Sequence, residues 1–172
     1  NNRVQRFSVD GVFEGAWGTP DSDLGQFADP AAVTVAPDGS VWVADRVRDH
    51  VQRFSPDGEF LARWGSSGSG FGQILAPQGI AVAQDGTVFV ADSGNHRVQA
   101  FDADGASLRV WGGSGTGEGR FSFPAGIALD ASERVYVADR GNSRIQVFDR
   151  DGAFLYAWGR EGAAPGQLRQ PQ

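Results

Sequence analysis

Short runs of alternating apolar and polar residues recur along the whole chain, separated by Asp-Gly and Asn-containing turns. The middle of the chain shows the arrangement in full and predicts strands at 79–83, 87–92, 97–101 and 107–111. Alternating Val, Phe, Tyr and Trp residues with Asp-Gly turns between them are typical of β-hairpins. No segment has the three- and four-residue apolar spacing of an amphipathic helix. The pattern therefore predicts an all-β protein.

The strand predicted at 87–92 has apolar residues on both faces. Val88 and Val90 point one way, and Phe89 points the other. Because both faces are apolar, we expect this strand to be covered on both sides. A four-stranded unit of this kind cannot stand alone and must stack against its own copies.

An internal repeat of 47 residues fixes the architecture. Residues that keep this spacing are Trp17, Trp64, Trp111 and Trp158; Phe7, Phe54, Phe101 and Phe148; Pro30, Pro77, Pro124 and Pro171; and Asp45, Asp92 and Asp139. A period of about 40 to 50 residues with four strands in each copy is the signature of a β-propeller blade. A β-solenoid would need shorter coils, so the sequence predicts a propeller of four-stranded antiparallel blades.

The repeat register predicts one propeller region, 1–172, and divides it into blades. Its parts are a half blade plus loop at 1–29, blades at 30–76, 77–123 and 124–170, and the start of another at 171–172. Such an open arc exposes sheet edges and uncovered blade faces. We therefore expect a fragment of a larger propeller that self-associates or pairs with further blades.

The stretch "GIAVAQDGTVFVADSGNHRVQAF" (79–101) resembles the NHL repeat, and the resemblance covers the entire chain in four registers. This resemblance implies a propeller of usually six blades, in which the first strand of each module lines the central channel. We therefore expect an incomplete, open arc of a six-bladed parent. The module at 30–76 departs from the others, because Arg48 and His50 stand where the next copy has Asn95 and Arg97.

Composition narrows the possible chemistry. The 15 cationic residues are all arginine, and the chain contains neither lysine nor cysteine. These absences exclude a phosphate-loop lysine, a Schiff base, a thiol nucleophile and thiolate metal sites. The net charge of −6 argues against a general nucleic-acid binder.

Arginine without lysine fits a GC-rich, bacterial genome. The compartment stays open, with an extracytoplasmic or secreted location favoured, and no apolar run predicts a membrane span.

The recurring pattern Asp-x-x-Asn-x-Arg permits two interpretations. In one, Asp92 orients His96 as a general base. However, the residue equivalent to His96 is Asp49 in one module and Ser143 in another, and no G-x-S-x-G motif is present. We therefore favour a structural latch, in which the acid caps the turn and pairs with a neighbouring arginine, while the asparagine is left-handed. The predicted latch residues are Asp45, Asp92, Asn95 and Asp139, and no catalytic residue is predicted.

The polar turns and the glycine-rich loops are expected to share one face, which we take as the ligand surface. The loops at 65–70 and 112–119 lack the G-x-G-x-x-G pattern before a helix, so a phosphate site is not predicted. The predicted ligand-binding rim consists of Arg46, Arg48, His50, Ser93, His96, Arg97, Arg140, Asn142 and Arg144. These side chains would bind acidic or carbonyl groups through hydrogen bonds and charge pairing.

No cofactor and no metal site is predicted. The acids of "DSDLG", Asp21 and Asp23, together with Asp29, are the candidates for a metal site, against which we favour a solvated loop. We therefore expect a non-enzymatic binding module for a protein, peptide or glycan. A fragment of a propeller enzyme, a metal-dependent lyase or a lactonase-like hydrolase with its catalytic residues in other blades, stays the alternative. RNA binding, known for some propellers of this family, ranks third.

Overall fold

The computed structural model describes residues 1–18 and 24–172. Within them, antiparallel strands form three four-stranded sheets and one two-stranded sheet. The two-stranded sheet pairs β1 (Val4–Phe7) with β2 (Phe13–Trp17). The prediction of an all-β fold with four-stranded antiparallel blades is therefore confirmed.

The three complete blades follow one another along the chain. The first contains β3 (Pro30–Val35), β4 (Val41–Asp45), β5 (His50–Phe54) and β6 (Phe60–Trp64). The second contains β7 (Gly79–Val82), β8 (Val88–Asp92), β9 (Arg97–Phe101) and β10 (Ser107–Gly112), with the 3-10 turn η1 (Ser93–Asn95). The third contains β11 (Pro124–Leu129), β12 (Val135–Asp139), β13 (Arg144–Phe148) and β14 (Phe154–Trp158), with η2 (Arg140–Asn142). The strands predicted in the middle of the chain match the second blade to within one residue.

Residues of one strand reach the cores on both of its sides. Val88, Phe89 and Val90 of β8 have no exposed surface. Val88 and Val90 pack into a cluster with Trp42 of the preceding blade, whereas Phe89 packs with Val135 of the following blade. The expectation that β8 is covered on both faces is confirmed, and apolar burial from both sides stabilises the stack.

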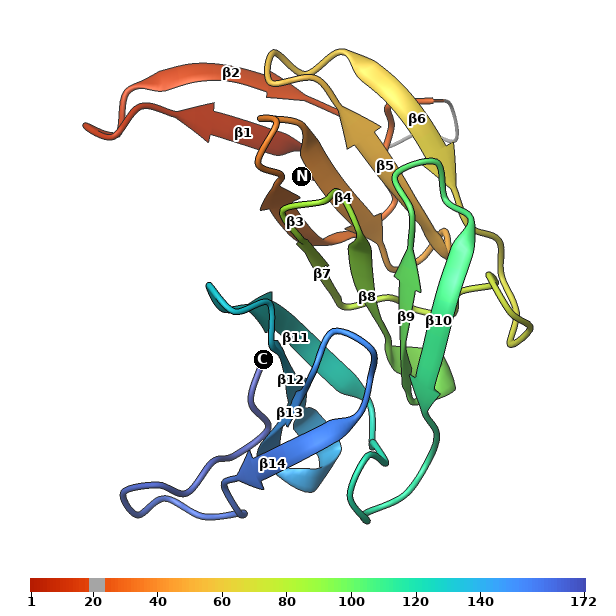
Figure 1. Cartoon of the computed structure of the whole chain (residues 1–172). Coiled ribbons are helices and arrows are strands. Elements are labelled where there is room, and N and C mark those ends of the chain that lie inside the picture. Colours follow the sequence, from red (N-terminus) through yellow and green to blue (C-terminus); the bar gives the residue numbers. More distant parts are fainter. Residues whose placement is uncertain (19–23) are drawn as a thin grey trace.

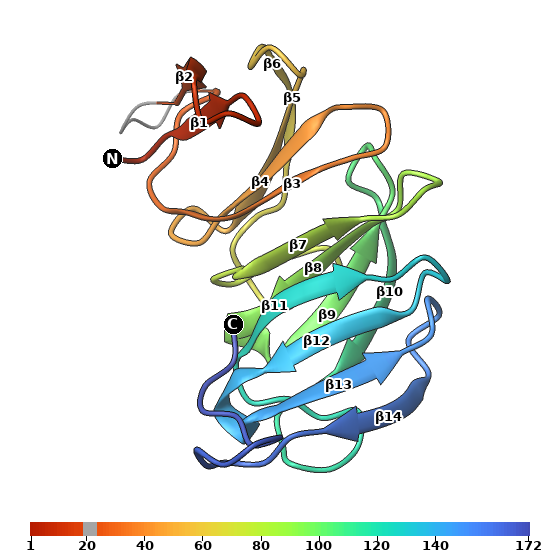
Figure 2. The same cartoon turned by 90° about the vertical axis from the view of Figure 1, so that its left-hand side faces the viewer.

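The blades form an open arc around their first strands. Figure 1 shows the sheets fanned around a concave side on which both ends of the chain lie. Seen from that side, β3, β7 and β11 run next to one another, and β7 contacts both of its neighbours (Figure 2). The fold is thus an open partial propeller, whereas the blade number of the parent and the predicted blade boundaries stay predictions. No helix in the described ranges is long and apolar enough to cross a membrane.

Candidate functional site

A buried carboxylate holds each polar turn. Asp92, at the end of β8, has no exposed surface, and its oxygens accept hydrogen bonds from four groups. The donors are Leu75 N (2.7 Å), Asn95 Nδ2 (2.9 Å), Arg97 Nε (2.7 Å) and Gln99 Nε2 (2.9 Å). Burial of a charge is tolerated here because the carboxylate is both paired and hydrogen-bonded.

The arginine of this group ties one blade to the loop that precedes it. Arg97 Nη1 donates to Ser69 O at 2.7 Å, and its Nη2 donates to the carbonyls of Gly70 and Gln73 at 2.8 Å. Asn95 Nδ2 also reaches Gly68 O at 2.8 Å. The carbonyl groups of the glycine-rich loop 65–73 therefore fasten this loop to the turn of the blade that follows it.

The same arrangement recurs one repeat later. Asp139 accepts from Ser122 N, Asn142 Nδ2 and Arg144 Nε, each at 2.8 Å. Arg144 Nη2 donates in turn to Gly117 O and Arg120 O. A buried group built twice with the same partners has the geometry of a latch.

The first complete blade uses a variant of the latch. Asp45 Oδ1 accepts the backbone N–H groups of Val47 and Arg48 at 3.1 Å, so here the acid does cap the turn. Arg48 Nε lies 3.7 Å from Asp45 Oδ2. His50, which occupies the position of Arg97, is buried, and burial lowers its pKa below the usual 6.5. Its Nε2 has no hydrogen-bond partner within the described ranges.

The prediction that Asn95 is left-handed is wrong. Asn95 belongs to the 3-10 turn η1, and the left-handed residue is His96, with φ of +55°. Asp49 and Ser143 take the same conformation at the equivalent positions. Asn95 lies inside the 3-10 turn, and the next residue closes this turn in the left-handed conformation, with the His96 N–H bonded to Ser93 O.

His96 supports the loop that leads into the next blade. Its Nδ1 accepts the backbone N–H of Phe123 at 3.0 Å, and the two rings lie 4.4 Å apart. Asp49 makes the equivalent bond one repeat earlier, where its carboxylate accepts Ala76 N at 2.7 Å. Because a histidine and an aspartate make the same bond, the side chain acts here as an acceptor that joins two blades.

These contacts sort the predicted rim residues into two groups. Most of them bind their own chain: Arg48, Arg97, Asn142 and Arg144 through the latches, and His96 through Phe123. Ser93 is buried, and its hydroxyl has no partner within the described part of the chain. Of the predicted rim residues, Arg46 and Arg140 line a cavity.

That cavity measures about 530 Å³ and lies where the first strands begin, and we call it the channel mouth because the resemblance places the central channel along these strands. Its lining residues are Asp29, Pro30, Ala31, Arg46, Gln78, Ala125, Gly126, Arg140 and Gln172. Ala31, Gln78, Ala125 and Gln172 occupy one position of the repeat, and Arg46 and Arg140 occupy another. The stacking of the blades thus brings residues of the same register to one ring.

The two arginines of the mouth differ in their partners. Arg46 Nε donates to Asp29 Oδ2 at 2.8 Å, so its charge is paired. Arg140 makes one long hydrogen bond, 3.4 Å from its Nη2 to Gln170 Oε1, and no ion pair within the described residues. The mouth therefore presents a guanidinium group that can take a carboxylate or carbonyl oxygen.

Sequence reasoning missed Gln78 and Gln172 as mouth residues. Both follow the recurring proline, so the 47-residue register contained the signal. The charged residues of the polar turns gave a stronger signal of ligand binding than these two uncharged glutamines.

Of the three acids predicted as a candidate metal site, the structure describes Asp29. Asp21 and Asp23 lie outside the described residues, and the carboxylate of Asp29 binds Arg46. Within the described residues, no group of three or more His, Asp or Glu side chains is placed to hold a metal ion.

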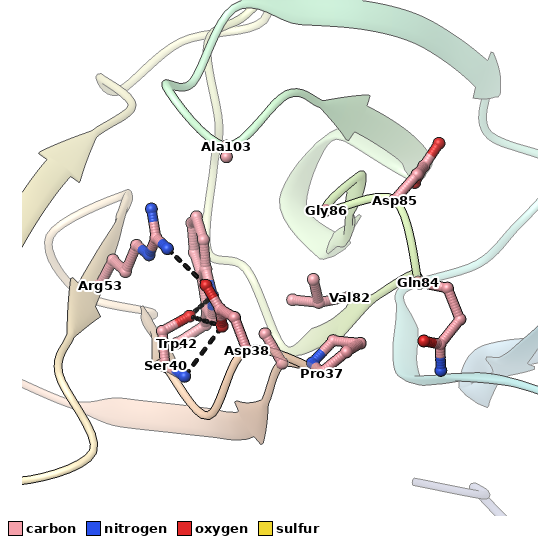
Figure 3. Close-up of a pocket in the computed structure, with 11 residues that line it drawn as sticks. Pro37, Asp38, Ser40, Trp42, Arg53, Val82, Gln84, Asp85, Gly86 and Ala103 are labelled. Atoms are coloured by element: carbon pink, nitrogen blue, oxygen red, sulfur yellow. Dashed lines mark hydrogen bonds and ion pairs between the residues drawn. The ribbon is translucent and has the colours of Figure 1, made fainter.

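A second hollow lies at the other end of the strands, between the β3–β4 and β7–β8 turns (Figure 3). It measures about 230 Å³. The guanidinium of Arg53 lies over the ring of Trp42, 5.2 Å from its centroid, and Arg53 Nη2 donates to Asp38 at 2.7 Å. Ala103, which packs against the cluster that contains Trp42, also lines the hollow.

The next blade junction also has a hollow, of about 380 Å³, but there an arginine bridges the two blades. Arg150, one repeat after Ala103, reaches Asp85 Oδ2 at 2.5 Å and Glu133 Oε2 at 2.6 Å. The backbone N–H of Thr87 and the guanidinium of Arg150 together lower the pKa of Asp85 to about 2. Ala103, at the equivalent position, is too short to form such a bridge.

Comparison with known proteins agrees with the fold. The family model of the NHL repeat matches residues 27–54, 76–101 and 121–148. No curated protein matches the sequence significantly.

Solved structures of similar shape include enzymes. A streptogramin B lyase superposes with a TM-score of 0.68 at 16% identity over 91% of this chain and 47% of its own. A catalytically inactive variant of virginiamycin B lyase from Staphylococcus aureus, solved with quinupristin, gives 0.66 at 17% identity over 91% and 48%. Hydrazine synthase of Kuenenia stuttgartiensis gives 0.63 at 17% identity over 86% and 38%. The chain thus spans about half or less of these proteins, and at such identities the likeness shows the fold alone.

Proposed function

Because this chain is built of NHL repeats and belongs to the NHL-repeat propellers, we propose that it is a non-enzymatic binding module for a protein, peptide or glycan. The partner binds at the rim, over the channel mouth, where Arg46 and Arg140 reach it first. The observation that carries the proposal is the cavity of about 530 Å³ bordered by Arg140, a guanidinium without a carboxylate partner in the described residues.

The remaining rim residues have a supporting part in this proposal. Arg97 and Arg144 fasten the glycine-rich loops beside the mouth, and His96 fastens the loop before Pro124. Loops that are held on rigid strands provide defined hydrogen-bonding groups around a central cavity. The ligand groups that match this surface are carboxylates and carbonyls, since the donors are guanidinium and amide groups.

A fluorescein-labelled acidic peptide of alternating Asp and Gly residues tests the proposal by fluorescence anisotropy. We expect binding that weakens at least about tenfold in the Arg46→Ala, Arg140→Ala double variant, because charge-assisted hydrogen bonds contribute about 1.5–3 kcal/mol each. Arg109→Ala is the matched control, since Arg109 pairs with Asp151 on an outer strand and is similarly exposed. Unchanged binding in the double variant, and also in Arg144→Ala, would contradict the proposal.

The enzyme alternative draws its support from the lyases that share this fold. Elemental analysis of the purified protein separates the two functions. A stoichiometric divalent metal would favour the metal-dependent enzyme over the binding module. For the RNA-binding alternative, the discriminating result is an affinity for single-stranded RNA that falls steeply with salt.

We also propose that the uncovered faces of the arc pair with another blade.

A further inference from the structure

The hairpin turns at one end of the strands form an acidic face. In each sheet the turns that join the first strand to the second and the third to the fourth lie at the same end, because neighbouring strands are antiparallel. Arg134 and Arg150 are the only arginines in these turns, whereas every one of them contains an Asp. The turns span 8–12, 36–40, 55–59, 83–87, 102–106, 130–134 and 149–153. This face therefore favours a positively charged partner, and the latch arginines lie at the opposite end.

The hollow of about 230 Å³ opens on this acidic face. The β3–β4 turn, with Asp38, borders it on one side, and the β7–β8 turn, with Gly86, borders it on the other (Figure 3). Pro37, Val82 and Ala103 provide apolar lining. Both blades that border the hollow are complete, so each of them has its neighbour in place here.

The next blade junction shows which group binds between two such turns. There Arg150 donates to Asp85 Oδ2 at 2.5 Å and to Glu133 Oε2 at 2.6 Å. The 47-residue register places Asp38 at the position of Asp85, and Ala103 at the position of Arg150. The junction that contains the hollow therefore keeps the carboxylate but lacks the cation that the chain supplies one repeat later.

The two residues beside Ala103 add negative charge next to the hollow. Asp102 and Asp104 flank Ala103, and neither makes an ion pair within the described residues. In the next repeat the same three positions read Asp-Arg-Asp, so Arg150 supplies a positive charge between the two acids. At the hollow both acids are kept, and the arginine between them is missing.

The carboxylate of Asp38 can accept a further donor. Its Oδ1 accepts Ser40 N at 2.9 Å and Ser40 Oγ at 2.6 Å, whereas its Oδ2 accepts Arg53 Nη2 at 2.7 Å. Each carboxylate oxygen has two lone pairs, so Oδ2 can take a second N–H group. The Asp38 side chain is also 55% exposed. Arg53 carries the one positive charge among the residues that line the hollow, and Asp38, Asp102 and Asp104 together outnumber it.

We propose that the hollow binds an arginine side chain of a basic partner peptide, whose guanidinium contacts Asp38 as Arg150 contacts Asp85. The aliphatic part of the guest side chain packs on Pro37 and Val82, because both belong to the apolar lining. A planar guanidinium can donate to two acceptors at once, as Arg150 does, whereas an ammonium group is a compact point charge. The site lies at the other end of the strands from the channel mouth, so it does not depend on the proposed rim function.

A fluorescein-labelled peptide of alternating Arg and Gly residues tests the proposal by fluorescence anisotropy at low ionic strength. We expect it to bind the wild-type chain more tightly than a Lys-Gly peptide does, and we expect no binding when citrulline, a neutral isostere, replaces Arg. Ala103→Arg should abolish binding, because the new side chain takes the place of the guest. Asp38→Asn should weaken binding about two- to fivefold, as is typical of a partly exposed pair. Urea denaturation of both variants verifies that they are folded.

Two matched variants separate the hollow from the charge of the whole face. Ala131→Arg adds the same charge to another turn of this face, and Asp10→Asn removes an acid from a turn that does not border the hollow. Both should bind the Arg-Gly peptide within about twofold of the wild type, because distant exposed charges interact weakly.

Three results would overturn the proposal: no binding of the Arg-Gly peptide to the wild type, equal binding of the Lys-Gly peptide, or equal weakening by Ala103→Arg and Ala131→Arg. The Arg46→Ala, Arg140→Ala double variant should bind the Arg-Gly peptide unchanged. A failure of rim binding therefore stays distinct from a failure of arginine binding in the hollow.

Discussion

The Nε of Arg97 lies 2.7 Å from Oδ2 of Asp92, a carboxylate that has no exposed surface. Every polar neighbour of that carboxylate is a donor: a backbone N–H, an asparagine amide, a glutamine amide and the guanidinium. The charge is thus satisfied only while the turn of one blade and the loop before it stay together. The latch couples local turn geometry to the stacking of the blades.

Asp92→Asn should therefore destabilise the protein by about 3–5 kcal/mol, because one carboxylate oxygen becomes an amide that faces other donors. Urea denaturation monitored by tryptophan fluorescence measures the loss. Asp38→Asn is the control, since Asp38 also pairs with an arginine at 2.7 Å but is 55% exposed. That exposed pair should contribute no more than about 1 kcal/mol. Equal losses in the two variants would contradict the latch.

Apolar alternation predicted the strands and the 47-residue spacing predicted their stacking, because both patterns are visible in the order of residue types. Val88, Phe89 and Val90 show this, since their alternation indicated a strand covered on both faces. The candidate site was less predictable. Which arginines stay available depends on where backbone carbonyls lie: Arg97 is surrounded by three of them, whereas Arg140 is not. Every residue has a backbone carbonyl, so the positions of these acceptors cannot be inferred from residue types.

The left-handed residue shows the same limit. The sequence offered Asn95 and His96 as neighbours, and residue preference favoured the asparagine. The structure instead places the left-handed residue at the end of the 3-10 turn, where His96, Asp49 and Ser143 all stand. The geometry of the turn therefore overrode the preference of the individual residue types.

Burial of His50 predicts a pH dependence of stability. Desolvation lowers the pKa of the folded protein's His50 below 6.5, so the unfolded chain binds its proton more readily. Stability from this residue is fully present above about pH 6.5 and is lost as the pH falls through that value towards the lower folded pKa. The free energy of unfolding at about pH 7.5 and about pH 5 measures the loss. His50→Gln should reduce the difference between the two, and an unchanged difference would show that other groups cause it.

The Asp85 carboxyl reports on the junction between the second and third complete blades. Its pKa of about 2 arises first from the Thr87 backbone N–H and then from Arg150. Arg150→Met should therefore raise this pKa but leave it below the usual 3.8, as followed by NMR titration of the carboxyl carbon. Because the folded pKa is depressed, the stabilisation is present above pH 3.8 and is lost as the pH falls towards 2. Arg109→Met, which removes a different cross-blade pair, should leave Asp85 unchanged.

The open hollow beside Ala103 predicts a stabilising substitution. At the next junction Arg150 bridges to Asp85, and Asp38 holds the corresponding position on the wall of the hollow. Ala103→Arg should place a guanidinium beside Asp38 and add about 0.5–1 kcal/mol, typical of a partly exposed pair. For a chain of this size the Tm should rise by about 2–4 °C per kcal/mol. Differential scanning calorimetry measures the shift.

Two further variants separate this bridge from a simple change in charge. Ala131→Arg adds the same charge on an exposed turn and should give no comparable gain. In an Asp38→Asn background the Ala103→Arg gain should disappear, because the coupling energy of the double-mutant cycle belongs to the pair. A gain that survives without Asp38 would mean that filling the hollow of about 230 Å³ stabilises the junction by packing alone. The repeat supports the first result, since Arg150 bridges two neighbouring blades through its bond to Asp85, the equivalent of Asp38.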